Sequence, residues 1–508
     1  MSRVEQLFTP SAGMQLLARA WVWPAAAVLT TAAFLLLRSS VAGVDDVSWL
    51  ITASERLLDG QRLYVDILEP NPPASVWLYV PAVWLARFFG LAPELILDIQ
   101  TFLCAAAGLG LSAGILRSGG TAARFRGPGL FVCGFFILAL LPHAVFGQRD
   151  HYALMMLAPA LAVLMQRAEG HLVPLALAAL VGVLAGIGVS IKPPYALCLG
   201  LAAVFGVAQI NPRPRLLRAL MLAAVRPEAV ACCAMIALYI LAIALAAPEF
   251  ATDMLPILSL IYLPARLPVT ELVVQPAFLL CALVLAMVML ATTGKPRAPV
   301  CVCASASVGA MLAFLAQGKG FQDHAFPMLA LAAAASAFAL LDVRVSVARV
   351  GQIIALAVLV GVSGGAWRLL RLNWDSTDLR QAIEQVQPAP RMLSISSSLL
   401  VGHPIVRQLG GVWVGRAPSL WIHNLGAARR QFDKLDDQTL AQIEVFERAE
   451  RDRLLEDIRT QRPDVILVGI SGADWSKWAA ADSAISGQLA AYEDRGASMG
   501  VRILRRRR

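Results

Sequence analysis

The sequence predicts a polytopic α-helical membrane protein with a small α/β domain at its C-terminal end. Of the 508 residues, 58% are hydrophobic and 15% are charged, whereas a soluble domain carries about 25% charged residues. The mean hydropathy is +0.67. The apolar residues form uninterrupted runs of roughly twenty, the length that a helix needs to cross about 30 Å of hydrocarbon. An ordinary soluble enzyme is therefore excluded.

The apolar runs predict about eleven transmembrane helices. The first run has no small-residue cleavage site behind it, so we expect a retained helix rather than a signal peptide. We expect the helices at about residues 21–40, 94–116, 129–147, 153–167, 172–190, 194–210, 228–247, 270–292, 299–316, 325–341 and 350–367.

The loop charges predict the orientation of these helices. The net charge is +9, but the cations lie in short loops between apolar runs, which is typical of membrane orientation and not of nucleic-acid binding. If residues 74–90 are not counted as a crossing, these cationic loops share one side, which the positive-inside rule makes cytoplasmic. We therefore expect 74–90 to be an amphipathic or half-inserted helix at the outer interface. The cations on the cytoplasmic side are Arg3, Arg19, Arg117, Arg124, Arg126, Arg167, Arg213, Arg215, Arg218, Arg226, Lys295, Arg297, Arg344 and Arg349.

The chain after residue 367 has a different character. Charged residues become frequent, and short apolar segments at 391–396, 465–470 and 501–504 favour buried strands. Between them, 440–461 has apolar residues at helical spacing. The alternation of strand and helix predicts an α/β domain at 368–508, outside the cytoplasm, after a membrane domain at 1–367 whose first outer loop is 41–93.

The first outer loop opens with two adjacent carboxylates, Asp45 and Asp46. At the membrane surface, one carboxylate of such a pair can act as a general base that removes a proton from an attacking hydroxyl. Alternatively, the two residues cap a helix at 47–58, because a helix N-terminus favours anions. Later in the same loop, Glu69 precedes a proline-rich turn, which is either purely structural or carries Glu69 to the membrane surface.

Ionisable residues also occur in the short outer loops. Arg149, Asp150 and His151 lie between two apolar runs, where charges are costly unless they are paired or functional. An Arg149–Asp150 pair that joins two helices is the structural alternative. Lys192 and Lys319 each lie at an outer helix end, where they neutralise a lipid phosphate or extend to the interface.

The order of these features resembles the GT-C glycosyltransferase superfamily. The resemblance rests on the first span, the acidic pair, the segment 55–60 (ERLLDG), an acidic turn with a proline pair, and an aromatic interfacial helix, and it covers roughly residues 20–200. The most similar members are the lipid A aminoarabinose and galacturonic acid transferases and the protein mannosyltransferases. Those enzymes take a sugar from a polyprenyl phosphate at the outer membrane face. The resemblance implies a GT-C-like fold, with Asp45 as the catalytic base, Asp46 beside it and Asp150 as a second catalytic acidic residue.

Two positions depart from the family pattern. Ser48 and Asn71 stand where the aminoarabinose-type enzymes carry arginine and lysine that contact the donor phosphate. The resemblance therefore leaves phosphate binding to other cations, which are Arg149, Lys192, Lys319 and His324. Glu69 and His151 are expected to support the site. Some relatives bind a divalent metal through Glu and His, so Glu69 with His324 is a remnant candidate for a divalent metal, although we assign no residue as a metal ligand.

The sequence as a whole predicts a glycosyltransferase that moves a sugar from a polyprenyl-phosphate donor to a lipid, glycan or protein hydroxyl. We expect a multi-pass protein of a bacterial-type inner membrane, with a cytoplasmic N-terminus and a periplasmic or extracellular C-terminal domain. The absence of a Gly-rich nucleotide loop and of Cys/His metal spacing agrees with this prediction. The alternatives are a lipid-linked glycan transporter or flippase, which would favour internal repeats and mid-span charges, or a catalytically degenerate scaffold.

Overall fold

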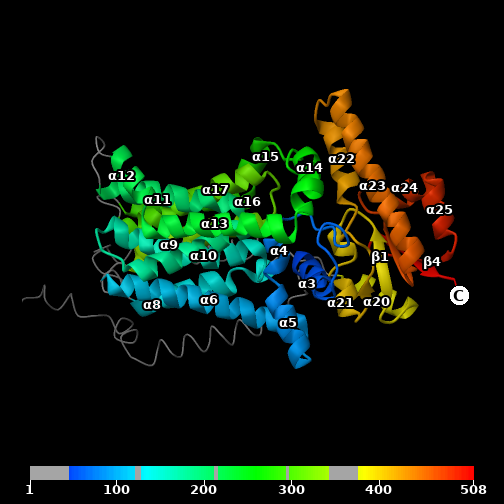
Figure 1. The fold of residues 1–508 in the computed structure, drawn as a ribbon, viewed down its shortest axis with the longest axis horizontal. Coiled ribbons are helices and arrows are strands. Elements are labelled where there is room, and N and C mark those ends of the chain that lie inside the picture. The colour runs from blue at the N-terminus through cyan, green and yellow to red at the C-terminus, as the bar shows by residue number, and fades with distance from the viewer. Residues whose placement is uncertain (1–44, 120–126, 211–215, 293–296, 342–375, 508) are drawn as a thin grey trace, which may run out of the picture.

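The computed structural model describes residues 45–119, 127–210, 216–292, 297–341 and 376–507, and its two parts are a bundle of helices and a sheet (Figure 1). The predicted first and last spans, 21–40 and 350–367, lie outside the described residues. So do Arg3, Arg19, Arg124, Arg126, Arg213, Arg215, Lys295, Arg344 and Arg349.

The bundle helices begin and end within a few residues of the predicted spans. Pro93, Pro227 and Pro276 each stand at the start of a helix, where a missing backbone N–H costs nothing. The helices are α6 (Pro93–Ser118), α8 (Gly127–Phe135) with short turns η2 (Phe136–Leu140) and η3 (His143–Val145), α9 (Arg149–Ala168), α10 (Leu175–Ile191) with η4 (Pro193–Tyr195), α11 (Ala196–Ile210), α13 (Pro227–Ala246), α16 (Pro276–Ala291), α17 (Ala298–Gln317) and α18 (Gln322–Leu341).

Four of the described helices, α6, α13, α17 and α18, are long and apolar enough to cross a membrane. Small residues let the helices approach closely, as is common in membrane bundles. A Cβ atom added to Gly309 of α17 would lie 2.4 Å from the Leu197 carbonyl oxygen of α11, so these two backbones are in contact. The fold is thus that of a helical membrane protein, and the total of eleven crossings stays a prediction.

Two segments that the sequence predicted as loops contain helix. The 248–269 segment folds into η6 (Phe250–Met254), α14 (Leu255–Ile257) and η7 (Leu258–Tyr262), followed by α15 (Val269–Val273). α12 (Leu216–Ala224) lies in the cationic loop before α13. The pattern did not separate these short helices from the neighbouring loops because they are much shorter than a membrane span.

The first outer loop is also largely helical. It forms α3 (Asp45–Leu58), α4 (Ala74–Trp77) and α5 (Val80–Phe89) at the end of the bundle nearest the sheet (Figure 1). α5 buries Ala82, Val83 and Ala86 on one side, while Trp84 and Phe88 are exposed and stack on each other. An exposed aromatic face is typical of a helix at a membrane interface, and this placement stays a prediction.

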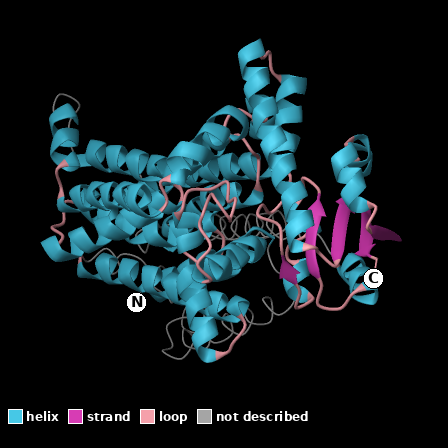
Figure 2. Cartoon of the chain, turned by 45° about the vertical axis from the view of Figure 1, so that its right-hand side comes forward, coloured by secondary structure: helices cyan, strands magenta, loops and turns pink. Residues whose placement is uncertain are grey.

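The C-terminal part holds a five-stranded sheet in the order β2-β1-β3-β5-β4 (Figure 2). β1 pairs in parallel with β2 and β3, whereas β5 pairs antiparallel with β3 and β4. The strands are β1 (Arg391–Ile395), β2 (Val412–Trp413), β3 (Val465–Gly469), β4 (Tyr492–Ser498) and β5 (Val501–Arg506). The helices are α20 (Thr377–Val386), η8 (Leu399–Val401), α21 (Ile405–Gln408), α22 (Trp421–Phe432), α23 (Asp437–Gln461), α24 (Trp475–Ala481) and α25 (Ser483–Leu489).

The two faces of the sheet pack against different parts of the chain. Leu393 and Ile466 face α23, α24 and α25, whereas Met392 and Val465 share a hydrophobic core with Trp49 of α3 and with α4, α5 and α20. Strand alternation explains this, because neighbouring side chains point to opposite faces. The region 376–507 therefore shares a hydrophobic core with the first outer loop. The predicted domain boundary at 367/368 assigns these two regions to different domains.

Polar contacts reinforce this shared core. The Arg407 guanidinium binds both carboxylate oxygens of Glu55, at 2.7 and 3.0 Å, and the Glu94 carboxylate at 2.6 Å. Arg56 of α3 donates to the Gly415 carbonyl oxygen at 2.6 Å. We call these contacts of Arg56 and Arg407 the latch. The latch holds the sheet region against α3 at the end of the bundle.

Candidate active site

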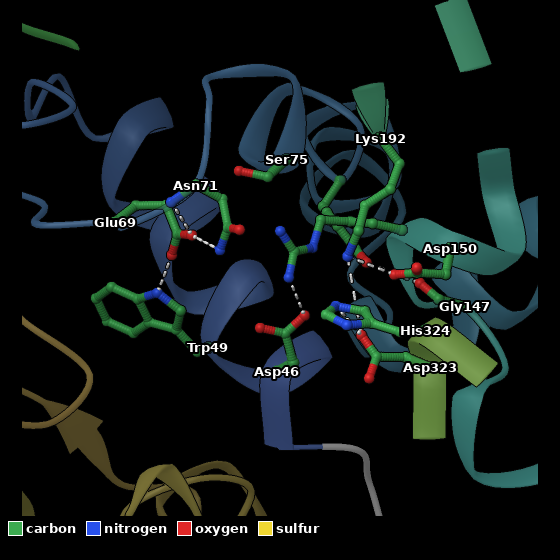
Figure 3. A network of polar contacts seen from close by, with 12 residues as sticks. Asp46, Trp49, Glu69, Asn71, Ser75, Gly147, Asp150, Lys192, Asp323 and His324 are labelled. Carbon is green, nitrogen blue, oxygen red and sulfur yellow. Dashed lines mark hydrogen bonds and ion pairs between the residues drawn. The ribbon is translucent and has the colours of Figure 1, made fainter. Parts of the chain in front are cut away.

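Charged side chains converge at the end of the bundle that faces the sheet (Figure 3). They come from the start of α3, the turn after residue 68, the start of α9, the end of α10 and the start of α18. We call this group the polar cluster, and it consists of Asp46, Glu69, Arg149, Asp150, Lys192, Asp323 and His324. Most of the sequence-predicted site residues therefore meet in space.

The start of α9 carries two oppositely charged residues into the cluster. The turn at Gly147 has a φ of 79°, which glycine adopts without strain, and α9 begins two residues later. Arg149 is 7% exposed, and its Nη2 atom lies 3.1 Å from the Asp46 carboxylate. Asp150 is fully buried and accepts hydrogen bonds from Lys192 Nζ, at 2.8 Å, and from the Tyr195 hydroxyl. The alternative Arg149–Asp150 pair is therefore wrong.

Lys192 is held inside the cluster instead of extending to an interface. It follows the last residue of α10 and is 8% exposed. Besides its bond to Asp150, its Nζ atom lies 4.0 Å from the Asp323 carboxylate. Asp323 also lies 3.6 Å from Nε2 of His324. One ammonium group is thus shared by two carboxylates that come from different helices.

The Glu69 carboxylate is fixed by the turn that follows it. It accepts hydrogen bonds from the Trp49 indole N–H and from the Asn71 backbone N–H, the latter at 2.9 Å. The Asn71 side chain donates to the same carboxylate. Burial raises the pKa of Glu69, and the positive charge of Arg149 opposes that rise. Asn71 therefore holds Glu69 in place.

Asp45 and Asp46 both lie in the first turn of α3 and have different surroundings. Their position agrees with the capping alternative, because the helix N-terminus favours negative charge. Asp46 pairs with Arg149. Asp45 forms no ion pair with any other residue that the structure describes, and burial together with the Asp46 charge raises its pKa to about 6. Helix capping and a chemical role are thus compatible here.

Two predicted site residues lie elsewhere. The Lys319 ammonium donates to the carbonyl oxygens of Tyr262, at 2.5 Å, and Ala265, and burial lowers its pKa to about 8. His151, in the first turn of α9, is buried against the preceding segment, and its Nε2 atom lies 2.7 Å from the Leu138 carbonyl oxygen. Both residues fix backbone near the cluster, and their roles in a binding site stay predictions.

The cluster does not bring Glu69 and His324 together as metal ligands. Figure 3 places them on opposite sides. A different set, Asp150, Asp323 and His324, offers ligand atoms within 4.8 Å of one another. However, Lys192 and Tyr195 already engage the two carboxylate oxygens of Asp150. This arrangement fits an ammonium ion better than a metal ion.

Several buried polar atoms around the cluster lack a hydrogen-bond partner among the described residues. They include Nε of Arg149 and Nδ1 of His324 in the cluster itself, while the unpaired hydroxyls of Ser48 and Ser190 are two residues from Asp46 and Lys192 along the chain. Buried polar groups in folded proteins are almost always paired, because an unpaired one costs about 1–3 kcal/mol. A set of unpaired groups next to two buried cations is therefore typical of a site for a polar, negatively charged ligand.

Three residues of the site were not predicted to belong to it. Asp323 directly precedes His324 in the sequence, and its carboxylate at an outer helix end was a usable signal. Tyr195 follows Lys192 by three residues, and one turn of chain brings its hydroxyl to Asp150. Trp49 carries no signal, because its bond to Glu69 depends on how α3 packs against the later turn.

Comparison with solved structures identifies the fold. The chain superimposes on ArnT from Cupriavidus metallidurans, a structure bound to undecaprenyl phosphate, with a TM-score of 0.52 and 14% sequence identity. The match covers 96% of this chain and 98% of that one. No family model and no curated protein sequence matches the chain. ArnT is a GT-C lipid A aminoarabinose transferase, so the resemblance read from the sequence is confirmed at the level of the fold.

Proposed function

We propose that this protein transfers a sugar from a polyprenyl-phosphate donor to the hydroxyl group of an acceptor. The observation that carries the proposal is the pair of buried cations, Arg149 and Lys192, at one end of a bundle with the ArnT fold. The ArnT structure contains undecaprenyl phosphate. A polyprenyl phosphate has a hydrocarbon chain that inserts into the bilayer and a negatively charged phosphate headgroup that such cations bind.

Arg149 and Lys192 are the proposed phosphate ligands. The phosphate gains negative charge as its bond to the sugar breaks, and fixed cations stabilise that charge in the transition state. The unpaired Nε of Arg149 gives the guanidinium capacity for a second anion besides Asp46. Asp46 and Asp150 then act as positioning residues, because each binds one of the two cations. Lys319 and His324 remain predicted contributors.

Asp45 is the proposed general base. A carboxylate paired with arginine is a weak base, whereas the pKa of Asp45 is raised to about 6, close to the pH at which the enzyme would work. Asp45 would take the proton of the acceptor hydroxyl while the oxygen of that hydroxyl attacks the anomeric carbon of the donor sugar. The bond from that carbon to the phosphate oxygen breaks, and polyprenyl phosphate leaves with the electron pair. This direct displacement inverts the anomeric centre.

The same proposal includes the placement in the membrane. The sheet region and α3, whose first turn carries Asp46 of the polar cluster, share one end of the bundle (Figure 1), and the loop charges favour the outer compartment for that end. The sheet region would cover the site and select the acceptor. Reporter tags after Leu91 and after Arg508 should both read the outer compartment of a bacterial-type inner membrane. A cytoplasmic signal after Leu91 would overturn the orientation.

The decisive experiment combines lipid identification with two matched variants. Mass spectrometry of the purified protein should find a bound polyprenyl phosphate. In a transfer assay with that donor, Asp45→Asn should lower the rate by about 10²–10⁴-fold, the usual contribution of a general base, while lipid retention stays unchanged. Asp46→Asn has the same change of charge and should cost less. If Asp45→Asn stays active and Asp46→Asn is inactive, Asp45 is not the general base. If the purified protein contains no polyprenyl phosphate, the proposed function is wrong.

A further inference from the structure

The start of α18 brings a carboxylate with unused hydrogen-bonding capacity into the polar cluster. The closest charged neighbours of Asp323 among the described residues are Lys192 Nζ at 4.0 Å and His324 Nε2 at 3.6 Å. Both distances exceed that of a hydrogen bond. Asp150, whose carboxylate lies within 4.8 Å of the Asp323 carboxylate, receives hydrogen bonds from Lys192 and Tyr195. Lys192 is therefore hydrogen-bonded to Asp150 and only ion-paired with Asp323, whose oxygens keep their hydrogen-bonding capacity.

His324 supplies an independent sign that a ligand reaches this place. It is 4% exposed, and its Nδ1 atom has no hydrogen-bond partner among the described residues. Figure 3 shows that the side chains of Lys192, Asp323 and His324 point toward one another. An imidazole nitrogen can donate or accept, according to the tautomer. One open acceptor group and one open nitrogen thus lie next to the proposed phosphate ligand.

We propose that Asp323, with His324 beside it, binds hydroxyl groups of the donor sugar. This inference rests on the proposed function, because it takes Lys192 as a phosphate ligand. The sugar is joined directly to the phosphate, so groups that flank Lys192 meet the sugar ring. A carboxyl group accepts hydrogen bonds in either protonation state and also donates one when it is protonated, and the hydroxyls of a sugar both donate and accept. A hydroxyl-rich monosaccharide fits this place better than an apolar group does.

Other roles for Asp323 lead to different results. If Asp323 only orients Lys192, its loss weakens the binding of any polyprenyl phosphate, with or without a sugar. If Asp323 only supports the start of α18, its loss lowers the melting temperature and leaves the choice between lipids unchanged. A sugar-binding role alone predicts a change that is specific to the glycosylated lipid.

The test measures two affinities for each variant of the full-length protein in detergent. The probes are undecaprenyl phosphate and a panel of undecaprenyl phosphates that carry glucose, galactose, mannose or an amino pentose. We expect the wild type to bind at least one glycosylated lipid more tightly than the bare lipid. In Asp323→Asn that preference should fall about tenfold, the scale of one hydrogen bond, while affinity for the bare lipid stays within about twofold.

Two further variants complete the test. His324→Gln should reduce the same preference by a smaller factor, because the amide retains one donor and one acceptor. Asp253→Asn, an exposed carboxylate of η6, should change neither affinity. Equal weakening of both lipids in Asp323→Asn, an unchanged preference, or a wild type with no preference for any glycosylated lipid would overturn the sugar assignment. A wild type that binds no undecaprenyl phosphate would instead reject the proposed function itself.

Discussion

The polar cluster and the latch are two charged regions that lie against the same helix, α3, and they are satisfied to different degrees. In the latch, Nε, Nη1 and Nη2 of both Arg56 and Arg407 bind protein oxygens. In the cluster, Arg149 binds Asp46 through Nη2, while its buried Nε has no partner among the described residues. Arg149 is buried, whereas Arg56 and Arg407 are partly exposed, and the arginines also differ in what is left for a ligand.

This difference separates architecture from chemistry. A fully bonded arginine has no capacity for a substrate, so its contribution is to the stability of the fold. An incompletely bonded one costs stability, which is typical of sites that are completed by a ligand. Substitutions in the latch should therefore change folding, whereas substitutions in the cluster should change binding and rate.

The largest expected effect is on the latch. Arg407→Ala leaves Glu55 and Glu94 without their cation at the junction of the bundle and the sheet region. We expect the free energy of unfolding to fall by about 3 kcal/mol, because hydrogen bonds from Arg407 to two carboxylates are lost at a partly exposed junction. Denaturation in detergent measures this loss. Folded Arg407→Ala protein should retain its lipid, and lipid loss without destabilisation would contradict the comparison.

The next effect is on lipid affinity in the cluster. Arg149→Ala removes a charge-assisted contact to the phosphate, worth about 1.5–3 kcal/mol, or roughly tenfold to a hundredfold in affinity. Titration with undecaprenyl phosphate measures it. Lys319→Met is the matched removal of a cation, and it should weaken the lipid less, because its ammonium already binds two backbone carbonyl oxygens. A larger loss of affinity in Lys319→Met would make Lys319 the main phosphate ligand, as the sequence allowed.

The smallest effect concerns pH. Because the pKa of Asp45 is about 6 in the fold, only about a tenth of it is ionised at pH 5, and the transfer rate should fall about tenfold between pH 7 and pH 5. The folded state binds this proton more tightly than the unfolded chain, so Asp45 lowers the stability as the pH rises from about 4 to 6. Rates and denaturation curves across this range test both signs. An acid limb near pH 4 would argue against Asp45 as the base.

The helices were predictable because each one is a local property of the chain. A run of apolar residues as long as the bilayer is thick has few alternatives to a membrane helix, and α6, α13 and α17 begin and end close to the predicted bounds. The same holds for β1, β3 and β5, which coincide with the short apolar segments that predicted them. Helices shorter than a span, such as α12 and α14, were missed because short patterns are ambiguous.

The acidic pair, Arg149, Asp150 and Lys192 could be selected from the sequence as candidates, because charge next to a membrane span is costly unless it is paired or functional. The partners they choose were not predictable. Adjacent Arg149 and Asp150 looked like a pair, yet each binds a residue far away in the sequence, Asp46 and Lys192. Successive residues of a helix point about 100° apart, so neighbours in sequence face different helices.

The sequence alone therefore determined that this chain is a membrane helical bundle with an α/β region, and which of its charges lie at one end. Only the tertiary structure decided that the sheet shares a core with α3, that Asp323 rather than Glu69 lies beside His324, and that the Arg149 guanidinium is left incompletely bonded. Apolar length and charge are properties of a segment, whereas pairing depends on the packing of segments that are distant in the sequence.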